Sequence, residues 1–409
     1  MLIEPLLNHD LILEKSDNIN INIVKPKKEN IVLYKTEEYE GIGDNYYSII
    51  KHDNKIKLYY RALNIKDFHI SSEEAQKYEQ TCYAESYDGL NFTKPNLSNN
   101  TNIIFKNGTS HNFSVFTVNN EIYGIGGTAF TSGSLLLLKE EDKKWYILRS
   151  LINNTHILQE FNHINHFDSH NIILYDDIND HYKIYLRDNK KTRRHIQYSI
   201  TKDLKTFEEF KNIDIDYEGE IYTSNIIKYP NSKYYIGFPS THIQENFNKK
   251  SMFMFSLDGY IWKVLDNNLC NNINTSYMIQ HGLIEIGDNF YIYVRDDVWN
   301  LKNNNLVCYS FEKHRMQEIV CYDLGYIYIG PFSINNLDIY LNYKTIEDGF
   351  IMIELQDSNK NILIKTEEMK GNFYFKKIIW KDIIKIDFNL EYIFKINLKN
   401  ACLYSIKFD

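Results

Sequence analysis

Five segments of the chain share one order of apolar and polar positions. Each begins with a short polar cluster, continues as an apolar run, and is followed after a turn by an aromatic-rich run. The first apolar residues of successive segments are separated by 67, 59, 54 and 57 positions. Periods of about 50 residues with about four strands each are typical of propeller blades, so we predict an all-β protein with a five-bladed β-propeller over residues 1–315. The first apolar residues are Tyr46, Phe113, Ile172, Ile226 and Leu283.

The segments also repeat at the level of hairpins and turns. Residues 47–50 and 56–61 form two strand-like runs around a polar turn, which indicates a hairpin. Residues 86–92 (Ser-Tyr-Asp-Gly-Leu-Asn-Phe) match residues 256–262 (Ser-Leu-Asp-Gly-Tyr-Ile-Trp), and residues 199–207 form a looser copy. Asp-Gly between strands is a strong turn signal. We expect the aromatic residue at the end of each copy to pack between neighbouring sheets.

The repeat is flanked by two regions of different character. Residues 1–35 are extended and mixed, and we expect them to form a lead-in strap to the propeller. After about residue 316 the repeat stops, but apolar and more mixed positions still alternate, as in a half-buried sheet. We predict a β-sandwich over residues 316–409, which serves as a packing domain or binds sugar. Its strand-like runs are residues 337–345, 349–357, 361–367, 373–380 and 392–408.

The composition favours strands and argues against several partners. Tyr (33) and Phe (23) are abundant while Gly (17) and Pro (6) are scarce, and aromatic residues favour strands. The net charge is −8 and no basic stripe is present, so we expect no nucleic-acid partner. Five scattered cysteines without a Cys-x-x-Cys pair indicate neither a disulfide framework nor a zinc site.

The sequence also gives an expectation for the cellular location of the protein. No run of 18 apolar residues occurs, so we expect no membrane span. The N-terminal residues carry acids where a signal peptide needs bases and a long apolar stretch. We therefore expect an intracellular or particle-associated protein, with secretion by another route left open. The sequence carries no signal of oligomeric state.

Polar clusters precede the first strand of each predicted blade. In a propeller these positions lie close to the axis, so side chains distant in sequence converge there. Glycoside hydrolysis needs two carboxyl groups across one bond, and the best candidates are Glu40 (or Asp44), Asp168 and Glu220 (or Glu218). Arg187 is placed to pair with an acid and keep it ionised. The candidate sugar-binding residues are Asp44, Asn45, His111, Asn112, His170, Asn171, Arg187, Tyr222, Asn225 and His281.

Each of these assignments has a structural alternative. Acids at strand starts often accept hydrogen bonds from backbone N–H groups or hold loops. His163, His166 and His170 near Asp168 show no compact ligand signature, so we predict no metal and no cofactor. The basic run at residues 190–194 is either a solvated turn or a site for an anionic group on a sugar.

These residues resemble those of a known family. The chain is similar to the five-bladed β-propeller glycoside hydrolases of the β-fructosidase/arabinanase superfamily (families 32, 43 and 68), and more so to a family-32-like branch. The likeness covers nearly the whole chain. Its landmarks are Leu-Ile-Leu-Glu-Lys at 11–15, Glu-Gly at 40–41, Tyr-Tyr-Arg at 59–61, Cys-Tyr-Ala-Glu-Ser at 82–86, Asp-Gly at 88–89, His-Asn-Phe at 111–113, Phe-Asp-Ser-His-Asn at 167–171, Tyr-Thr-Ser-Asn at 222–225 and Ala-Cys-Leu-Tyr-Ser at 401–405.

The resemblance implies three acidic roles. The superfamily uses a nucleophile or base, an orienting Asp that tunes pKa values, and a general acid, and these roles fall on Glu40, Asp168 and Glu220 respectively. The chain departs from the family by having Glu at the base position. It also lacks the Trp-Met-Asn-Asp-Pro, Arg-Asp-Pro and Glu-Cys motifs of family 32, so a fructan substrate is not implied. The family's appended β-sandwich matches residues from about 316 onward.

Three functions follow from this sequence. The first is a glycosidase acting on an oligosaccharide or glycan, which requires two converging carboxyl groups. The second is a non-catalytic glycan-binding propeller, for which Tyr46, Tyr222 and Trp299 are possible platforms. The third is a structural protein with a degenerate site. Carbohydrate is the partner that we expect.

Overall fold

The structure is a computed structural model of the chain. It describes residues 2–41, 46–65, 76–106, 108–127, 134–152, 167–190, 193–242, 249–270, 276–296, 305–381 and 386–409. Within these ranges the protein is nearly all β, with 33 strands and four short 3₁₀ helices. None of the helices in this part of the chain has the length and apolarity needed to cross a lipid bilayer. The helices are η1 (His9–Leu11), η2 (Glu38–Glu40), η3 (Gln76–Tyr78) and η4 (Gly108–Ser110).

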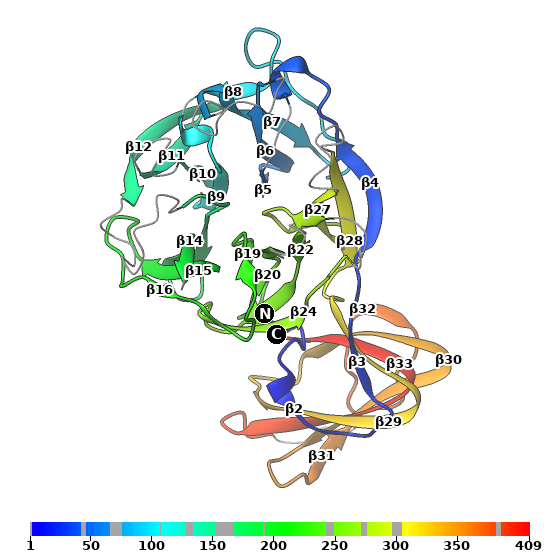
Figure 1. Cartoon of the computed structure of the whole chain (residues 1–409). Helices are drawn as coiled ribbons and strands as arrows, with labels where there is room; N and C mark the ends of the chain where they lie inside the picture. The colour runs from blue at the N-terminus through cyan, green and yellow to red at the C-terminus, as the bar shows by residue number, and fades with distance from the viewer. Residues whose placement is uncertain are drawn as a thin grey trace. The chain divides into compact units, whose positions relative to one another are not determined.

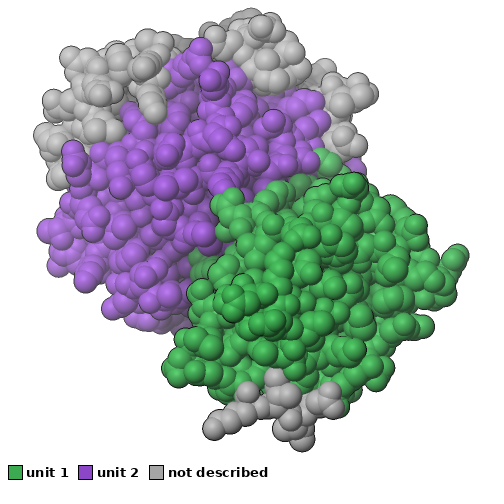
Figure 2. Space-filling model, turned by 90° about the horizontal axis from the view of Figure 1, so that it is seen from below, with its two compact units in different colours: residues 1–26, 229–233, 311–409 green, residues 27–228, 234–310 purple. Residues whose placement is uncertain are grey.

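The chain divides into two compact units, coloured separately in Figure 2. Unit 1 contains residues 1–26, 229–233 and 311–409, and unit 2 contains residues 27–228 and 234–310. The sequence predicted a single boundary between residues 315 and 316. The structure differs because strands from the first 26 residues pair with strands near the C-terminus rather than with the repeats.

Unit 2 is built from five sheets of four or five strands and one small three-stranded sheet, as far as its described residues show. Figure 1 shows the sheets set around a ring, with β5, β9 and β19 toward its middle. In the first three sheets the strands follow one another in chain order, so each is an antiparallel meander. Their strands are β5 (Tyr47–His52), β6 (Lys55–Leu63), β7 (Glu79–Ser86) and β8 (Ile103–Phe105); β9 (Ser114–Val118), β10 (Glu121–Gly126), β11 (Leu135–Glu141) and β12 (Lys144–Ile152); β13 (Ile172–Asp176), β14 (His181–Lys190), β15 (Arg193–Thr201) and β16 (Lys211–Asn212).

The remaining sheets of unit 2 are less regular. In the fourth sheet a short strand, β17, pairs in parallel with the outer strand β24. The strands of the small sheet, one of which includes Glu220, alternate along the chain with strands of the fourth sheet. The strands are β19 (Ile226–Lys228), β20 (Tyr235–Gly237), β23 (Phe253–Ser256), β24 (Ile261–Asp266) and β17 (Asp214–Ile215) in the fourth sheet; β25 (Tyr277–Ile279), β26 (Ile284–Ile286), β27 (Asn289–Asp296), β28 (Leu306–Glu312) and β4 (Lys27–Leu33) in the fifth; and β18 (Glu220–Ile221), β21 (Ser240–His242) and β22 (Lys249–Ser251) in the small sheet.

An early strand completes the last sheet of the ring. β4 pairs with β28, for example Leu33 opposite Leu306. Buried Leu33, Tyr47 and Tyr293 belong to one apolar cluster, so the first and fifth sheets share a core. Part of the predicted lead-in strap is thus a strand that closes the ring by backbone hydrogen bonds.

Side chains join the first strands of the first three sheets. The backbone N–H of Val115 in β9 donates to Ser48 Oγ in β5 at 3.0 Å. Ser114 Oγ donates to the backbone oxygen of Asn171, just before β13, at 2.6 Å. Because the middle of the ring has no continuous ladder, these hydroxyl groups satisfy backbone groups that would otherwise be buried without a partner.

The same kind of bond continues around the rest of the ring. Ser169 Oγ donates to the backbone oxygen of Tyr222 at 2.6 Å. Asn225 Nδ2 donates to the backbone oxygen of Gln280 at 2.9 Å, and the Tyr47 N–H donates to Gln280 Oε1 at 3.0 Å. Small polar side chains at the strand starts therefore hold neighbouring sheets together, which is one reason why these positions are polar.

The repeated Asp-Gly turns lock neighbouring sheets together. Tyr293 of the fifth sheet donates its hydroxyl to the backbone oxygen of Gly89, and Tyr185 of the third sheet does the same to Gly259. The aromatic residues that end the two copies, Phe92 and Trp262, meet these tyrosines edge to face, with ring centroids 5.9 and 6.3 Å apart. The prediction that these aromatic residues pack between sheets is confirmed.

Unit 1 is one hydrogen-bonded sheet of eight strands, and its described residues form one large apolar core and a smaller cluster of Val320, Cys402 and Tyr404. Its three long strands carry register shifts, and such bulges bend strands. Residues 337–345 and 349–357, expected as two strands, lie in the one strand β30 with a register shift between Thr345 and Phe350. The strands are β29 (Gln317–Ser333), β33 (Glu391–Phe408), β30 (Ile339–Gln356), β1 (Leu2–Glu4), β2 (Ile12–Lys15), β3 (Asn20–Ile23), β31 (Ile362–Lys365) and β32 (Asn372–Lys377).

Candidate functional site

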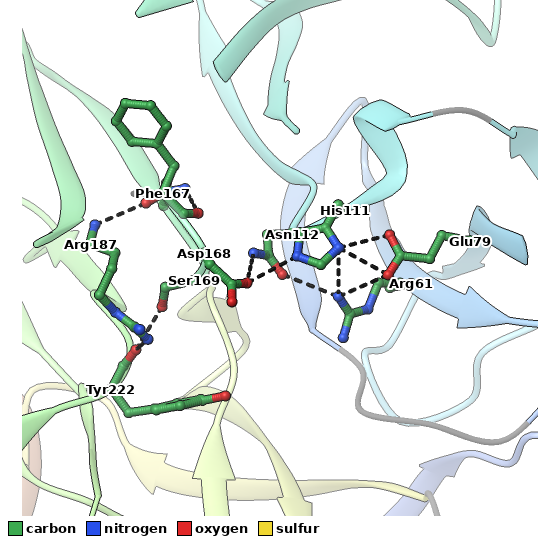
Figure 3. Close-up of polar contacts among 10 residues, drawn as sticks. Arg61, Glu79, His111, Asn112, Phe167, Asp168, Ser169, Arg187 and Tyr222 are labelled. Carbon is green, nitrogen blue, oxygen red and sulfur yellow. Dashed lines mark hydrogen bonds and ion pairs between the residues drawn. The ribbon is translucent and has the colours of Figure 1, made fainter. Parts of the chain in front are cut away.

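Polar side chains from several sheets meet around Asp168 (Figure 3). His111 and Asn112 follow η4 and precede β9, and Asp168 precedes β13. Asn112 and Phe167 both have positive φ, at +57° and +68°. A positive φ is strained for a bulky residue such as Phe, and strained backbone of this kind clusters at functional sites. The residue that follows Phe167 is Asp168.

Asp168 is held from one side and open on the other. His111 Nε2 lies 3.0 Å from Asp168 Oδ1, and Asn112 Nδ2 donates to the same oxygen at 3.2 Å. The Asp168 side chain is still 48% exposed. Burial alone would raise the pKa of Asp168, but the bond and charge of His111, the charge of Arg187 and the bond from Asn112 hold it well below its usual range. Asp168 is therefore an ionised carboxylate that faces solvent.

His111 lies between two carboxylates. Its Nδ1 is 2.9 Å from Glu79 Oε2, and its Nε2 faces Asp168 (Figure 3). Burial alone would lower the pKa of His111, but the hydrogen bonds to Asp168 and Glu79 outweigh burial and raise it. Arg61 contacts Glu79 at 3.5 Å and Asn112 Oδ1 at 3.3 Å. The four side chains thus fix the orientation of Asp168 through charge-assisted bonds.

The sequence analysis did not assign Glu79 or Arg61 to the site. Arg61 lies two residues before the end of the second strand of the first sheet, and Glu79 begins the third strand opposite Leu63. In an antiparallel meander those two positions lie at the same edge as the start of the first strand. The sequence signal was therefore present in the second and third strands, where Arg187 is the one residue that the sequence had indicated.

On the other side of Asp168, Arg187 and Tyr222 form a second contact group. The Arg187 guanidinium donates to the backbone oxygen of Tyr222, which also accepts the Ser169 hydroxyl. The guanidinium carbon lies 4.9 Å from the Tyr222 ring centroid. The Tyr222 ring extends from this bond toward the Asp168 cluster, as Figure 3 shows. Tyr222 is only partly buried.

Four other predicted residues support the ring rather than face solvent. Asn171 donates to the backbone oxygen of Phe167 at 2.9 Å and so braces the loop of Asp168, while Asn225 bonds backbone atoms across the ring. His170 stacks on Tyr46 with centroids 5.2 Å apart, and burial lowers its pKa well below the ordinary value. His281 lies 3.0 Å from Ser48 Oγ, and burial lowers its pKa to about 4.

Glu40 lies in a separate, closed environment. Its carboxylate is fully buried and accepts bonds from the Thr36 and Glu37 N–H groups at 2.9 Å, from Tyr60 at 2.5 Å and from Lys94 at 2.7 Å. No contact between Glu40 and the Asp168 cluster occurs among the described residues. Asp44 and Asn45, predicted for the same segment, lie outside the described residues.

Glu220 is buried in the small sheet and pairs with a cation. Arg194 Nη1 lies 3.1 Å from Glu220 Oε2, and the Arg194 N–H reaches Oε1 at 3.4 Å. Arg194 belongs to the basic run at residues 190–194, and its guanidinium carbon lies 5.7 Å from the Tyr222 ring. That ring links Glu220 and Arg194 to the residues around Asp168.

The described residues contain no group of three or more His, Cys, Asp or Glu side chains placed to hold a metal ion. The arrangement instead offers an ionised carboxylate, an imidazole whose pKa is raised by its two carboxylate partners, a guanidinium and a phenol around one open point. Such a set suits proton transfer and the binding of hydroxyl-rich molecules.

Solved structures share the fold of this chain. One titled glycoside hydrolase aligns over 70% of this chain and 92% of its own length, with 12% identity and a TM-score of 0.50. The chain has the fold of a glycoside hydrolase. Two further structures align with lower TM-scores: the catalytic domain of the family 62 α-L-arabinofuranosidase from Coprinopsis cinerea (13% identity, 73% of this chain and 99% of that chain, 0.49) and the Bombyx mori family 32 β-fructofuranosidase (10% identity, 94% of each chain, 0.48).

No protein-family model matches the sequence, and no curated protein is similar to it. At the identities found, the likeness establishes the fold and not the reaction. The reaction has to be argued from the side chains.

Proposed function

We propose that the protein is a glycoside hydrolase that acts on an oligosaccharide or glycan at Asp168. The observation that carries this proposal is the half-exposed, ionised Asp168 carboxylate, oriented by His111 and Asn112 in the middle of the ring. The glycoside hydrolase fold supports it. Within the proposal, the five larger sheets of unit 2 are the blades of a propeller and the bent sheet of unit 1 is a β-sandwich.

The contacts of the three predicted acids suit different roles. Asp168 is ionised and open, which suits a nucleophile, a base or a group that stabilises positive charge at the anomeric carbon. Glu220 is close to Tyr222 and pairs with Arg194, so it is the described candidate for the second carboxyl group. Glu40 is enclosed by four donors, which suits a structural role, and Asp44 is then the alternative acid of that segment. The roles implied by the resemblance remain predictions.

A second candidate function is glycan binding without turnover. One observation favours it. Among Glu40, Asp168 and Glu220, only the Asp168 carboxylate is substantially exposed and has few hydrogen-bond donors. In that case the partly buried Tyr222 ring would act as a sugar platform. Trp299, the other predicted platform, lies outside the described residues.

The test is sugar release from a broad glycan panel by the full chain and by Asp168→Asn. We expect the wild type to release sugar and D168N to lose about 10³-fold or more of turnover, equivalent to about 4 kcal/mol in the barrier. Asp44→Asn and Glu220→Gln then show which acid is the second group. The melting temperature of D168N should stay close to wild type because the carboxylate is half exposed.

The outcomes separate the two functions. Wild-type protein that binds glycans but releases no sugar supports the binding function. If D168N unfolds the protein, the cluster is structural and both proposals for Asp168 fail.

A further inference from the structure

Three cationic side chains surround the Tyr222 ring. Lys249 Nζ lies 3.9 Å from the ring centroid, Arg187 Cζ 4.9 Å and Arg194 Cζ 5.7 Å. They come from β22, β14 and β15, so three separate strands deliver positive charge to one phenol. Lys249 and Arg187 are buried, whereas Tyr222 is partly exposed. Tyr222 thus keeps part of its surface accessible beside two buried basic side chains.

The other groups around Tyr222 do not balance this charge. Glu220 pairs with Arg194, and Asp168 bonds primarily to His111. His242 stacks on the ring with centroids 5.9 Å apart. Burial first, and then Arg194, lower the pKa of His242, so this imidazole is neutral near pH 7 and adds no charge of its own. Near the phenol, three basic side chains thus face two carboxylates, one of which is shared with His111. Burial lowers the pKa of Lys249, and the interaction with Tyr222 opposes that shift.

The pKa of the Tyr222 phenol is lowered, as nearby positive charge requires. Burial alone would raise the pKa of Tyr222, and Asp168 acts in the same direction. The charges of Lys249 and Arg187 and a hydrogen bond from Tyr46 outweigh both and lower it. A lower pKa brings a phenol closer to neutral pH, where an acid transfers protons most effectively. Buried cations act strongly because solvent does not screen them.

We propose that Tyr222 is the proton donor of the site, with Lys249, Arg187 and Arg194 stabilising its phenolate. This inference rests on the proposed glycosidase function. In the reaction, the phenol proton passes to the glycosidic oxygen as the bond from that oxygen to the anomeric carbon breaks, and the bonding electron pair remains on the oxygen. Water adds its hydroxyl to the anomeric carbon, and the proton it gives up restores the phenol. Atoms and charge balance without a cofactor.

The first test needs no substrate. Tyrosinate absorbs at 295 nm, so subtracting the pH titration of Tyr222→Phe from that of the wild type isolates Tyr222. We expect one group with a midpoint below 10, the ordinary value for tyrosine. Lys249→Met should move this midpoint to higher pH. Lys211→Met is the matched control, because Lys211 Nζ also lies 3.9 Å from a tyrosine ring, that of Tyr260, and its removal should leave the midpoint unchanged.

The second test uses leaving groups. On the natural glycosidic bond, Y222F should lose about 10²- to 10⁴-fold of turnover, the usual contribution of a general acid. On the 2,4-dinitrophenyl glycoside of the same sugar, whose leaving group needs no proton, Y222F should lose less than about tenfold. A merely structural role would reduce both rates equally.

The results distinguish this inference from the function on which it rests. A Tyr222 midpoint at or above 10, or equal losses on both substrates, overturns the proton-donor role while D168N can still show that the protein is a glycosidase. Absence of turnover on every glycan overturns the glycosidase proposal and, with it, the reaction assigned to Tyr222. If K249M does not fold, Arg194→Gln serves as the second variant, because its guanidinium is 37% exposed.

Discussion

Glu40 and Asp168 are both acids that precede the first strand of a sheet, yet their surroundings are opposite. The Glu40 carboxylate is fully buried with four donors, while Asp168 is 48% exposed and takes its described bonds on one oxygen. A carboxylate that is enclosed by donors and shielded from solvent holds structure. One that keeps an oxygen open to solvent can meet a substrate. Position in the repeat is therefore a weaker guide to function than the number of donors.

The strongest test of this contrast compares Glu40→Ala with Asp168→Ala. Removing one partner of a buried ion pair costs about 3–5 kcal/mol, and E40A also leaves the Tyr60 hydroxyl without its carboxylate acceptor and Lys94 without its carboxylate partner. In a unit of this size that corresponds to a fall of roughly 10 °C in melting temperature. D168A should fall by a few degrees at most. The measurement is thermal unfolding followed by circular dichroism.

Glu40→Gln is the control for shape, because it keeps an acceptor and removes the charge opposite Lys94. Its melting temperature should lie between those of E40A and the wild type. Equal stability of E40A and D168A would show that the donor count does not separate the two acids.

A smaller effect is expected at Lys35, in the same segment as Glu40. Its Nζ is buried with no hydrogen-bond partner among the described residues, and burial lowers its pKa to about 7, although Glu40 opposes the shift. A lowered pKa means that the folded state holds the proton less tightly than the unfolded chain. Stability therefore falls as the pH drops from about 10.5 toward 7.

Lys35→Met removes this cost while keeping the apolar stem. We expect it to stabilise the protein by about 1–2 kcal/mol at pH 7 and by less at pH 10. Urea unfolding at the two pH values measures the difference. A variant less stable than the wild type at pH 7 would mean that Lys35 forms a favourable pair in the Glu40 segment.

The smallest effect concerns His111 at the open site. Its pKa is raised because the bonds to Asp168 and Glu79 outweigh burial, so its charge stabilises the fold at low pH and that contribution is lost as the pH rises through the folded pKa. Asp168→Asn replaces one of the two carboxylate partners with a neutral amide and should lower the pKa of His111. Titration of the imidazole Cε1 proton by NMR measures the shift.

His281 is the internal control for this titration. Burial rather than a carboxylate sets its pKa at about 4, so D168N should leave it unchanged. An unchanged pKa for His111 in D168N would show that Glu79 alone determines its charge.

The predicted site is only partly the site that the structure assembles. His111, Asn112, Asp168, Arg187 and Tyr222 meet as expected. His170, Asn171, Asn225 and His281 lie in the same region but bond the backbone or stack inside the ring. Eight of these nine follow from the sequence because strand starts are polar for both purposes, and Arg187, inside β14, follows as a cation placed to pair with an acid. It missed Glu79 and Arg61, which reach the same edge from the second and third strands of a meander.

The sequence by itself determined the β repeats, their turns and the aromatic residues that lock neighbouring sheets, because these depend on alternation and on residues close together in the chain. It also indicated the strands after residue 316. Only the tertiary structure decided that residues 27–33 complete the fifth sheet, that residues 1–26 join the C-terminal strands, and that Glu40 is enclosed while Asp168 is open. Those outcomes depend on pairings between residues hundreds of positions apart and on how many donors surround each charge, neither of which a local pattern encodes.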